Sequence, residues 1–578
     1  MKKIIKSLVL SLISFVSILI YSNMLLQNES YNIFISSLFF VLWYFYYKYE
    51  ISSDKRTKGY LLVLSVVVSL ILSIGHVVCR YIYTPLGDIF TIKNIIIVII
   101  QIVGFNFLFY RIFDFMFKKL NEIKFIENHK KMSIKNYLVM VLIIFLCSLI
   151  YFIRYYPAIM TPDSYYVIHY SNNFILSDFH TFGHTWWFGI FFHLGKLIFN
   201  NDNAAVAFSM INQMVCMSFI FATGIKFLYN KGLKKSICIV MLLFYALNPL
   251  YAHYNITLWR DVMFGGSFVL TLISIYEMVD KDKISKYSVI LFIVGVFTML
   301  FFRNNGIYVY LFSIPFLIIF LKGKRKQISI LTISIAIIYF VIKGPVFDYF
   351  KIEKTTSVEA FSIPLQQMAR VIATDKEIPD REKEFLERLF DYNLVKTKYT
   401  AWISDPIKNI TSNDILTNEK ATFFKTYLSL LVKYPRVYFE AYFSQTLGYW
   451  YPDQIYWATA GESSGFFEEE EVYCTPLTSG IYNDIIDSVT SRKLPLSNLI
   501  WSIGLQFILL FISTVICFYK KNKKYVICYV LLYGLWLSIM ASTPVFSELR
   551  YAYGLFTCMP IFIFMPFIIS SKKGSEVK

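Results

Sequence analysis

Four short segments of the sequence concentrate acidic, basic and imidazole side chains, although the chain around them is largely apolar. They are RYYPAIMTPDSYYVIHYSNNFILSDFHTFGHTWW at 154–187, HYNITLWRD at 253–261, FRNNG at 302–306 and STPVFSELRYAY at 542–553. Each segment lies beside a long apolar run, so helix ends can bring all four to one depth. Charged groups gathered at one membrane interface indicate a candidate functional site.

Asp163 is the acid that directly follows Thr-Pro in the first segment. Proline fixes the local backbone, and an Asp or Ser after it often caps the next helix. The residue types therefore allow two roles for Asp163, a helix cap or a catalytic acid or base. Ser164 is expected to cap or to form hydrogen bonds, because no Ser–His–Asp signature surrounds it.

Two histidines of the same segment, His180 and His184, stand four residues apart. On one helix they would share a face, and that spacing suits a metal ion or a phosphate oxygen. The alternative is a pair of interfacial histidines that form hydrogen bonds with backbone or water.

Three arginines, Arg260, Arg303 and Arg550, occur in the other segments. A guanidinium binds phosphate oxygens in a forked geometry, which makes the three together a candidate phosphate site. Arg260 could instead form a local ion pair with Asp261, which would cap a helix. Glu548 could pair with Arg550. Snorkelling of each arginine to the membrane interface is the remaining alternative.

The elements that position these residues are membrane helices. Of 578 residues, 57% are apolar and 16% charged, against about 45–50% and about 25% in soluble domains. This composition excludes a soluble enzyme, a disordered chain and a small disulfide scaffold. The net charge of +18 does not indicate nucleic-acid binding, because residues 344–497 are net acidic and the positive charges lie in short loops between apolar runs.

Apolar runs of spanning length predict an all-α polytopic membrane protein with about fourteen transmembrane helices. The predicted spans are 4–25, 31–49, 59–79, 92–117, 134–153, 204–229, 236–252, 261–279, 287–302, 307–321, 328–343, 498–519, 525–541 and 551–571.

Loop charge predicts the orientation. The eight inner segments carry 31 Lys and Arg residues, against 7 in the short outer segments, if both termini are cytoplasmic. A span over 185–199 would invert every later helix, so this stretch is expected to be a juxtamembrane or re-entrant helix at the outer face. The N-terminal helix is expected to be an uncleaved anchor, since no small-residue cleavage site follows it.

The chain is predicted to have four parts. They are a four-helix membrane extension at 1–133, a membrane core at 134–343 with the catalytic outer loop 154–203, an extracytoplasmic domain at 344–497 and a three-helix membrane segment at 498–578. Eight scattered cysteines with no CxxC pair indicate neither a zinc site nor a disulfide framework. Walker A, GxGxxG and HExxH motifs are all missing from the sequence.

The extracytoplasmic part is expected to be mainly helical. PDREKEFLERLFDY places Phe385, Leu386, Leu389 and Phe390 on one face, and EKATFFKTYLSLLVKYP follows the same period. The aromatic run 437–457 is expected to lie against the membrane or the catalytic face, and the acidic run 468–471 to be a solvated loop.

Six sequence pieces together resemble known membrane enzymes: YYPAIMTPDSYY, FHTFGHT, NPLYAHYNITLWRDVMFG, RNNGIY, FSIPLQQMAR and SELRYAY. Through them the chain resembles glycosyltransferases of the GT-C fold, such as protein mannosyltransferases and aminoarabinose transferases. More closely, it resembles a bacterial family of unknown function, domain of unknown function number 6020. The resemblance covers about residues 134–571 and implies a GT-C-like fold.

The resemblance also implies a reaction. Enzymes of the GT-C fold take a sugar from a polyprenyl-phosphate carrier on the outer face of the cell membrane, and an acid in the first outer loop serves as base on the acceptor hydroxyl. Here that acid is Asp163, and Glu548 and Arg550 would help to hold the carrier phosphate. The leaving phosphate needs cations or a divalent metal. Tyr165 stands where a second acid would bridge a metal, so no metal is assigned with certainty.

The expected function is therefore transfer of a sugar to an envelope glycan, lipid or protein acceptor, in contact with membrane lipids and without nucleic acid. Two alternatives stay open, a transporter or flippase of lipid-linked saccharide and a non-enzymatic envelope protein. A flippase should show two similar halves and charges near the membrane midplane. The sequence shows neither feature and carries a large outer segment instead.

Overall fold

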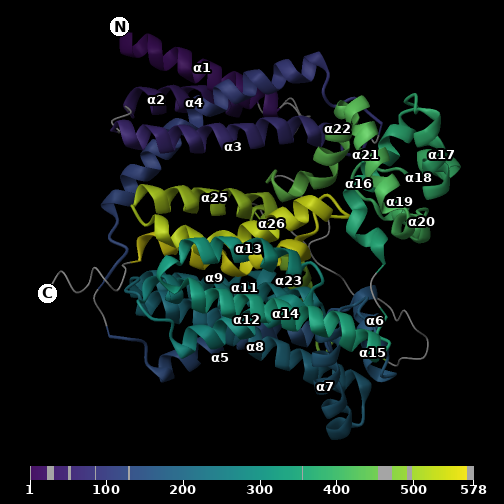
Figure 1. Ribbon diagram of the computed structural model, residues 1–578. Helices are drawn as coiled ribbons and strands as arrows, with labels where there is room; N and C mark the ends of the chain where they lie inside the picture. Colours follow the sequence, from purple (N-terminus) through teal and green to yellow (C-terminus); the bar gives the residue numbers. More distant parts are fainter. Residues whose placement is uncertain are drawn as a thin grey trace. The chain divides into compact units, whose positions relative to one another are not determined.

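The structure is a computed structural model, and it describes residues 2–22, 32–49, 54–84, 86–127, 130–353, 356–452, 472–490 and 497–568. These residues are mainly helical, and no strand occurs among them (Figure 1). The all-α fold class predicted from the sequence is confirmed. The acidic run 468–471 and the end of the aromatic run 437–457 lie outside the described residues.

Each of the fourteen apolar segments predicted to span the membrane contains a helix. These helices are α1 (Lys2–Ser22), α2 (Asn32–Lys48), α3 (Lys55–Tyr81), α4 (Ile92–Glu122), α5 (Ile134–Arg154), α8 (Asp202–Asn230), α9 (Lys235–Leu247) with α10 (Pro249–Asn255), α11 (Arg260–Asp280), α12 (Lys286–Phe302), α13 (Gly306–Phe320), α14 (Arg325–Val341), α25 (Ile503–Tyr519), α26 (Val530–Ser542) and α27 (Tyr553–Phe564).

Nine helical segments of the described chain are long and apolar enough to cross a membrane, or ten if the bent pair α9–α10 is one span. Three further apolar helices, α12, α13 and α25, are shorter than that limit. A multi-pass membrane protein is thus supported, while the count of fourteen spans stays a prediction. The apolar stretch 185–199, expected to be a juxtamembrane or re-entrant helix, lies in α7 (Phe182–Phe199), which is not among the nine candidate spans.

The remaining helices are shorter and mostly lie between these segments. They are α6 (Pro162–Asn172), α15 (Phe347–Tyr349), α16 (Ser362–Ala373), α17 (Asp380–Leu389), α18 (Tyr392–Lys398), α19 (Asp405–Lys408), α20 (Asn413–Asn418), α21 (Lys420–Lys433), α22 (Pro435–Thr446), α23 (Ile481–Thr490) and α24 (Ser497–Trp501), together with short 3₁₀ turns such as η6 (Lys523–Tyr529) and η7 (Leu549–Ala552) and a π turn at Ile342–Val346.

The chain folds into two compact units. Unit 1 comprises 1–124, 356–454 and 542–547, and unit 2 comprises 125–355, 455–541 and 548–578. The N-terminal helices therefore belong to the same unit as most of the large segment that follows α15. Each unit combines three separate stretches of the chain, whereas the sequence predicted four consecutive parts.

Unit 1 combines apolar helices with a helical cluster that has its own core. Within it, α1 packs on α4, where Ser14 Oγ donates to the Gly104 carbonyl at 3.1 Å and Ser17 Oγ to the Ile100 carbonyl at 3.0 Å. The helices α16–α22 enclose a buried apolar cluster (Figure 1). Its members include Phe385, Leu386, Leu389 and Phe390, so the predicted apolar face of α17 is confirmed.

Unit 2 is built around α11, the most deeply buried of the long apolar helices. Helices α8, α12 and α27 pack against it. Its apolar residues are buried all round, which is typical of a helix in the centre of a bundle. Because α11 runs through the unit, its two ends define two separate clusters of polar side chains.

The C-terminal end of α11 gathers lysines from predicted inner loops. Lys231 Nζ lies 2.9 Å from Asp280 Oδ2 and 3.0 Å from Glu277 Oε1. Tyr525 donates its hydroxyl to Asp280 Oδ1 at 2.7 Å, and Lys324 donates to the Lys281 carbonyl. Loops that were assigned to one side of the membrane by charge therefore lie at one end of this unit, and the candidate site residues lie at the other.

Candidate functional site

The first candidate segment is held against the segment that leads into α11. The Ile159 amide donates to the Ile256 carbonyl, and the Leu258 amide donates to the Ile159 carbonyl, each at 3.0 Å. Trp259 Nε1 donates to Thr161 Oγ1 at 2.8 Å. These contacts place the beginning of α6 beside the beginning of α11, which brings Asp163 close to Arg260.

The beginning of α6 is capped by residues other than Asp163. Thr161 is the N-cap residue, Pro162 follows it, and Ser164 Oγ accepts from the Thr161 amide at 3.0 Å in a capping box. Ser164 also donates to the Leu258 carbonyl at 2.8 Å. The expectation that Ser164 caps or forms hydrogen bonds is confirmed, and the Asp163 carboxylate is not needed as a cap.

Asp163 instead faces Arg550. Arg550 Nη1 lies 2.5 Å from Asp163 Oδ2, and Arg550 Nε lies 2.9 Å from Glu548 Oε1. The Asp163 side chain is 34% exposed, whereas those of Arg550 and Glu548 are 15% and 3% exposed. The sequence suggested the pair of Glu548 and Arg550; the structure adds a third member whose carboxylate stays accessible.

The charges around Asp163 decide its protonation. Burial opposes ionisation, but the positive charges of Arg550 and Arg260 outweigh it and hold the pKa of Asp163 below its ordinary value. Glu548 shows the opposite balance, because burial raises the pKa of this carboxyl although Arg550 favours the charged form. Asp163 is therefore ionised at physiological pH and can accept a hydrogen bond or a proton.

A second, buried ion pair joins Arg303, just after α12, to Asp261 in the first turn of α11. Arg303 Nε also donates to Asn305 Oδ1 at 3.1 Å, and its guanidinium lies 4.3 Å from the centre of the Tyr551 ring. Asp261 is 1% exposed. The local pair of Arg260 with Asp261 suggested by the sequence is wrong, since Asp261 pairs with Arg303 and Trp259 occupies the N-cap position.

Arg260 is the arginine of the site that keeps its charge available. It donates from Nη1 to the Phe179 carbonyl at 3.1 Å. Within the described chain, no carboxylate lies within ion-pair distance of its guanidinium. It is also the first residue of a 21-residue helix, whose free N–H groups favour an anion. Arg260 is thus the best-placed group for a phosphate.

The two histidines do not share a helix face as the sequence suggested. Thr181 has φ of 64° and is the N-cap of α7, so His180 precedes the helix and His184 lies in its first turn. The conformation of Thr181 is rare for a β-branched residue. It turns the chain so that His180 stacks on Tyr166 at 4.9 Å and approaches the Asp163 side of α6.

Both imidazoles are buried and neutral. Burial, together with the charge of Arg260, lowers the pKa of His180 to about 4 and that of His184 to about 3. In the described part of the chain, His180 Nε2 and both ring nitrogens of His184 have no hydrogen-bond partner. The structure therefore offers His180 as an uncharged polar group beside Asp163 and Arg260.

Glycine at position 183 allows the FHTFGHT motif to dock on the end of α12. A Cβ at Gly183 would stand 2.6 Å from the carbonyl oxygen of Phe301. Thr181 Oγ1 donates to the Phe302 carbonyl at 3.0 Å. Glycine is therefore needed in this motif because its backbone lies very close to the backbone of α12. The residue types alone did not indicate this contact.

Sequence reasoning missed Asp178 and Lys343. Lys343 Nζ lies 2.5 Å from Asp178 Oδ2 and donates to Asn304 Oδ1 at 3.1 Å. Lys343 belongs to the π turn after α14, a feature that often marks a functional position. The pair fixes the loop 173–181, which carries His180. In the sequence, Lys343 stands at the end of an apolar run, a position that is typical of an ordinary interfacial lysine. The sequence therefore did not indicate its pair with Asp178.

The candidate residues thus form one group at the beginning of α6 and α11. Arg550 contacts both Asp163 and Glu548, and Arg303 contacts Asp261. Across the described ranges, no three His, Cys, Asp or Glu side chains are arranged to hold a metal ion. What the arrangement offers is an accessible carboxylate beside an available guanidinium.

The comparison with protein families matches a family of unknown function, DUF6020, over residues 148–578. The match covers well over half of the chain, so the protein belongs to this family. It includes every candidate site residue. No curated protein and no solved structure matches the chain.

Proposed function

We propose that this member of the family is a membrane glycosyltransferase that moves a sugar from a polyprenyl-phosphate carrier to a cell-envelope acceptor. One observation carries the proposal: the accessible carboxylate of Asp163, which is not used as a cap, lies beside the available cation Arg260. The finer assignments, including the GT-C-like fold, an outer-face site and cytoplasmic termini, belong to the proposal.

Asp163 is proposed to be the base. The acceptor hydroxyl donates to the carboxylate, its oxygen attacks the anomeric carbon of the sugar, and its proton passes to Asp163 as the bond to phosphate breaks. Attack opposite the leaving group inverts the configuration of that carbon. Arg550 holds the carboxylate in position through the contact at 2.5 Å.

Arg260 is proposed to bind the leaving phosphate. Charge accumulates on the phosphate oxygens as the glycosidic bond breaks, and a preorganised guanidinium beside them lowers the barrier. The N-terminal end of α11 adds a favourable field. His180, uncharged and with an unpartnered Nε2 within the described chain, can donate one further hydrogen bond to a phosphate or sugar oxygen.

The distribution of charge favours a transferase over a flippase. The candidate residues gather at one end of α11, whereas the lysines of predicted inner loops gather at its other end. A carrier with a lipid tail in the bilayer presents its phosphate at such an interface. A flippase is expected to have charges along its path near the midplane.

The test compares envelope glycans of cells that express wild type or Asp163→Asn at matched protein levels. Asn keeps the size of Asp but cannot take the proton, so a sugar substituent is expected to disappear. Asp484→Asn serves as the matched control, because Asp484 is an exposed acid on α23 of the same unit.

Persistence of the substituent in Asp163→Asn cells refutes the assigned base. Loss in both variants points to a general effect on folding or expression and not to catalysis. If no glycan depends on the protein, the transport and non-enzymatic alternatives take precedence.

A further inference from the structure

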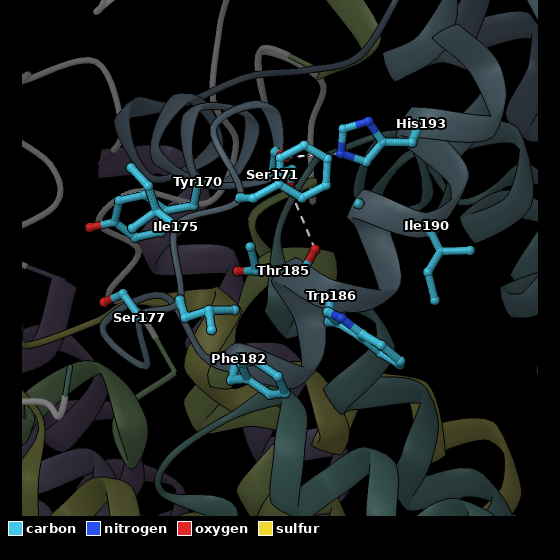
Figure 2. A pocket seen from close by; sticks show the side chains of 12 residues that line it. Tyr170, Ser171, Ile175, Ser177, Phe182, Thr185, Trp186, Ile190 and His193 are labelled. Carbon is cyan, nitrogen blue, oxygen red and sulfur yellow. Dashed lines mark hydrogen bonds between the residues drawn. The ribbon is translucent and has the colours of Figure 1, made fainter. Parts of the chain in front are cut away.

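A cavity of about 230 Å³ lies between α6 and α7, next to the candidate site (Figure 2). The loop 173–181 joins these helices, and its residues 174–177 complete the wall of the cavity. Phe174 in this loop stacks on His193 of α7 at 4.7 Å. The residues that line the cavity are Tyr170, Ser171, Phe174, Ile175, Leu176, Ser177, Phe182, Thr185, Trp186, Gly189, Ile190 and His193.

The lining is apolar with a few hydroxyl groups. Figure 2 draws Tyr170 and Ser177 on the left and Trp186 and Ile190 on the right, with Thr185 between them. Thr185 is 8% exposed, and within the described chain its hydroxyl has no hydrogen-bond partner. The cavity thus suits an amphiphile whose polar end lies near Thr185.

The hydroxyl side of the cavity adjoins the charged site. The Tyr170 ring, which lines the cavity, lies 5.8 Å from the His180 ring. The loop that supplies Ser177 to the cavity continues into Phe179, whose carbonyl accepts from Arg260 at 3.1 Å. A ligand with its chain in the cavity can therefore place an anionic head toward Arg260 and His180.

The size of the cavity and its surroundings indicate what kind of hydrocarbon chain it holds. The volume is below the roughly 300–1,000 Å³ of pockets for whole drug-sized ligands, so the cavity takes only a part of a longer molecule. Beyond it, α7 exposes Leu194, Leu197 and Ile198. An apolar helix face of this kind, outside the candidate spans, is typical of a helix at the lipid interface.

We propose that the cavity between α6 and α7 holds the phosphate-proximal part of the hydrocarbon chain of a polyprenyl phosphate. The rest of the chain extends along α7 into the bilayer. This assignment rests on the proposed function for the identity of the carrier, and it adds where this protein distinguishes a lipid phosphate from a soluble one. Ile190 and Gly189 are the residues that set the width of the cavity.

The test measures binding to the full-length protein in detergent, with three probes: a long-chain polyprenyl phosphate, the matching polyprenol and inorganic phosphate. Wild type is expected to bind the polyprenyl phosphate most tightly. Ile190→Trp should weaken that binding about tenfold or more, as expected from about two methylene groups that lose their burial, and should leave inorganic phosphate unaffected.

Two further variants make the test specific. Ile239→Trp is the matched control, since Ile239 lies on α9, is 46% exposed against 43% for Ile190, and does not line the cavity. Gly189→Leu narrows the cavity without a backbone clash, because a Cβ there meets only Ser171 at 3.4–3.5 Å. It should repeat the loss seen with Ile190→Trp, and the control should bind as wild type does.

Unchanged binding in both folded cavity variants overturns the proposal, and so does an equal loss in Ile239→Trp. Equal affinity for polyprenol and polyprenyl phosphate also overturns it, because the head would then not reach Arg260. Asp163→Asn should still bind the polyprenyl phosphate. Binding without any transfer by wild type would refute the proposed function while supporting the cavity assignment.

Discussion

Glu440 connects three parts of unit 1, and its two arginine partners allow a sharp test of how this unit is held together. Glu440 Oε1 accepts from the Ile89 and Phe90 amides at 2.9 and 3.2 Å, in the loop between α3 and α4. Arg370 Nη2 lies 3.0 Å from Glu440 Oε2, and Arg436 Nε lies 3.1 Å from Oε1. The carboxylate therefore joins α16, α22 and the loop before α4.

The two arginines differ in burial. The side chains of Arg370 and Glu440 are 1% and 2% exposed, whereas that of Arg436 is 46% exposed. Removal of one partner from a buried pair costs about 3–5 kcal/mol, because it leaves an uncompensated charge. An exposed pair contributes only about 0–1 kcal/mol. We expect Arg370→Met to lower the free energy of unfolding of unit 1 by about 3–5 kcal/mol and Arg436→Met by less than about 1 kcal/mol.

Proteolysis at graded denaturant concentrations measures this difference on the full-length protein in detergent. Cleavage within 356–452 reports the unfolding of the helical cluster α16–α22. A double variant, Arg370→Met with Glu440→Gln, should recover part of the loss, because no buried charge remains and the amide oxygen can still accept from Ile89. Equal effects of the two single arginine variants would refute the reasoning, since they would show that burial does not decide the strength of these pairs.

Three further predictions concern unit 2. Gly183→Ala should lower the free energy of unfolding by about 1–3 kcal/mol through overpacking, whereas Gly323→Ala, where a Cβ meets nothing within 4 Å, should leave thermal unfolding unchanged. Thr161→Val should cost about 1–3 kcal/mol in the same measurement, because a buried indole N–H loses its acceptor. In a transfer assay, Arg550→Gln should move the acid limb of the pH profile of kcat/KM to higher pH. The variant removes the main positive charge that lowers the pKa of Asp163, so burial raises that pKa. An acid limb that stays in place would exclude Asp163 as the group that titrates.

The helices were predictable from the sequence because the signal for them is local. Apolar runs and the period of PDREKEFLERLFDY depend on neighbouring residues, and the structure forms helices in both kinds of segment. The partners of the charged residues were not predictable, because they lie far apart in the chain. Arg550 is 387 residues from Asp163, and Lys343 is 165 residues from Asp178.

The pairing of Arg260 with Asp261 was incorrect for the same reason, because the true partner of Asp261 lies far away in the chain. This correction also bears on function. The sequence order allowed a local pair of Arg260 with Asp261, as an alternative to a phosphate site formed by Arg260, Arg303 and Arg550 together. Adjacent residues on a helix point in different directions, however, and Asp261 faces Arg303 instead. This exchange of partners leaves Arg260 available.

The three arginines of the site consequently have different surroundings, although their residue type alone predicted one shared role, phosphate binding. Arg303 compensates a buried carboxylate, and its loss should destabilise the fold. Arg550 contacts both Asp163 and Glu548, so its loss should change the acid–base behaviour of Asp163. Arg260 is available to a ligand, so Arg260→Gln should weaken phosphate binding with little effect on stability. In the proposed reaction the last two roles belong to separate residues, because Arg550 orients the base Asp163 while Arg260 binds the leaving phosphate.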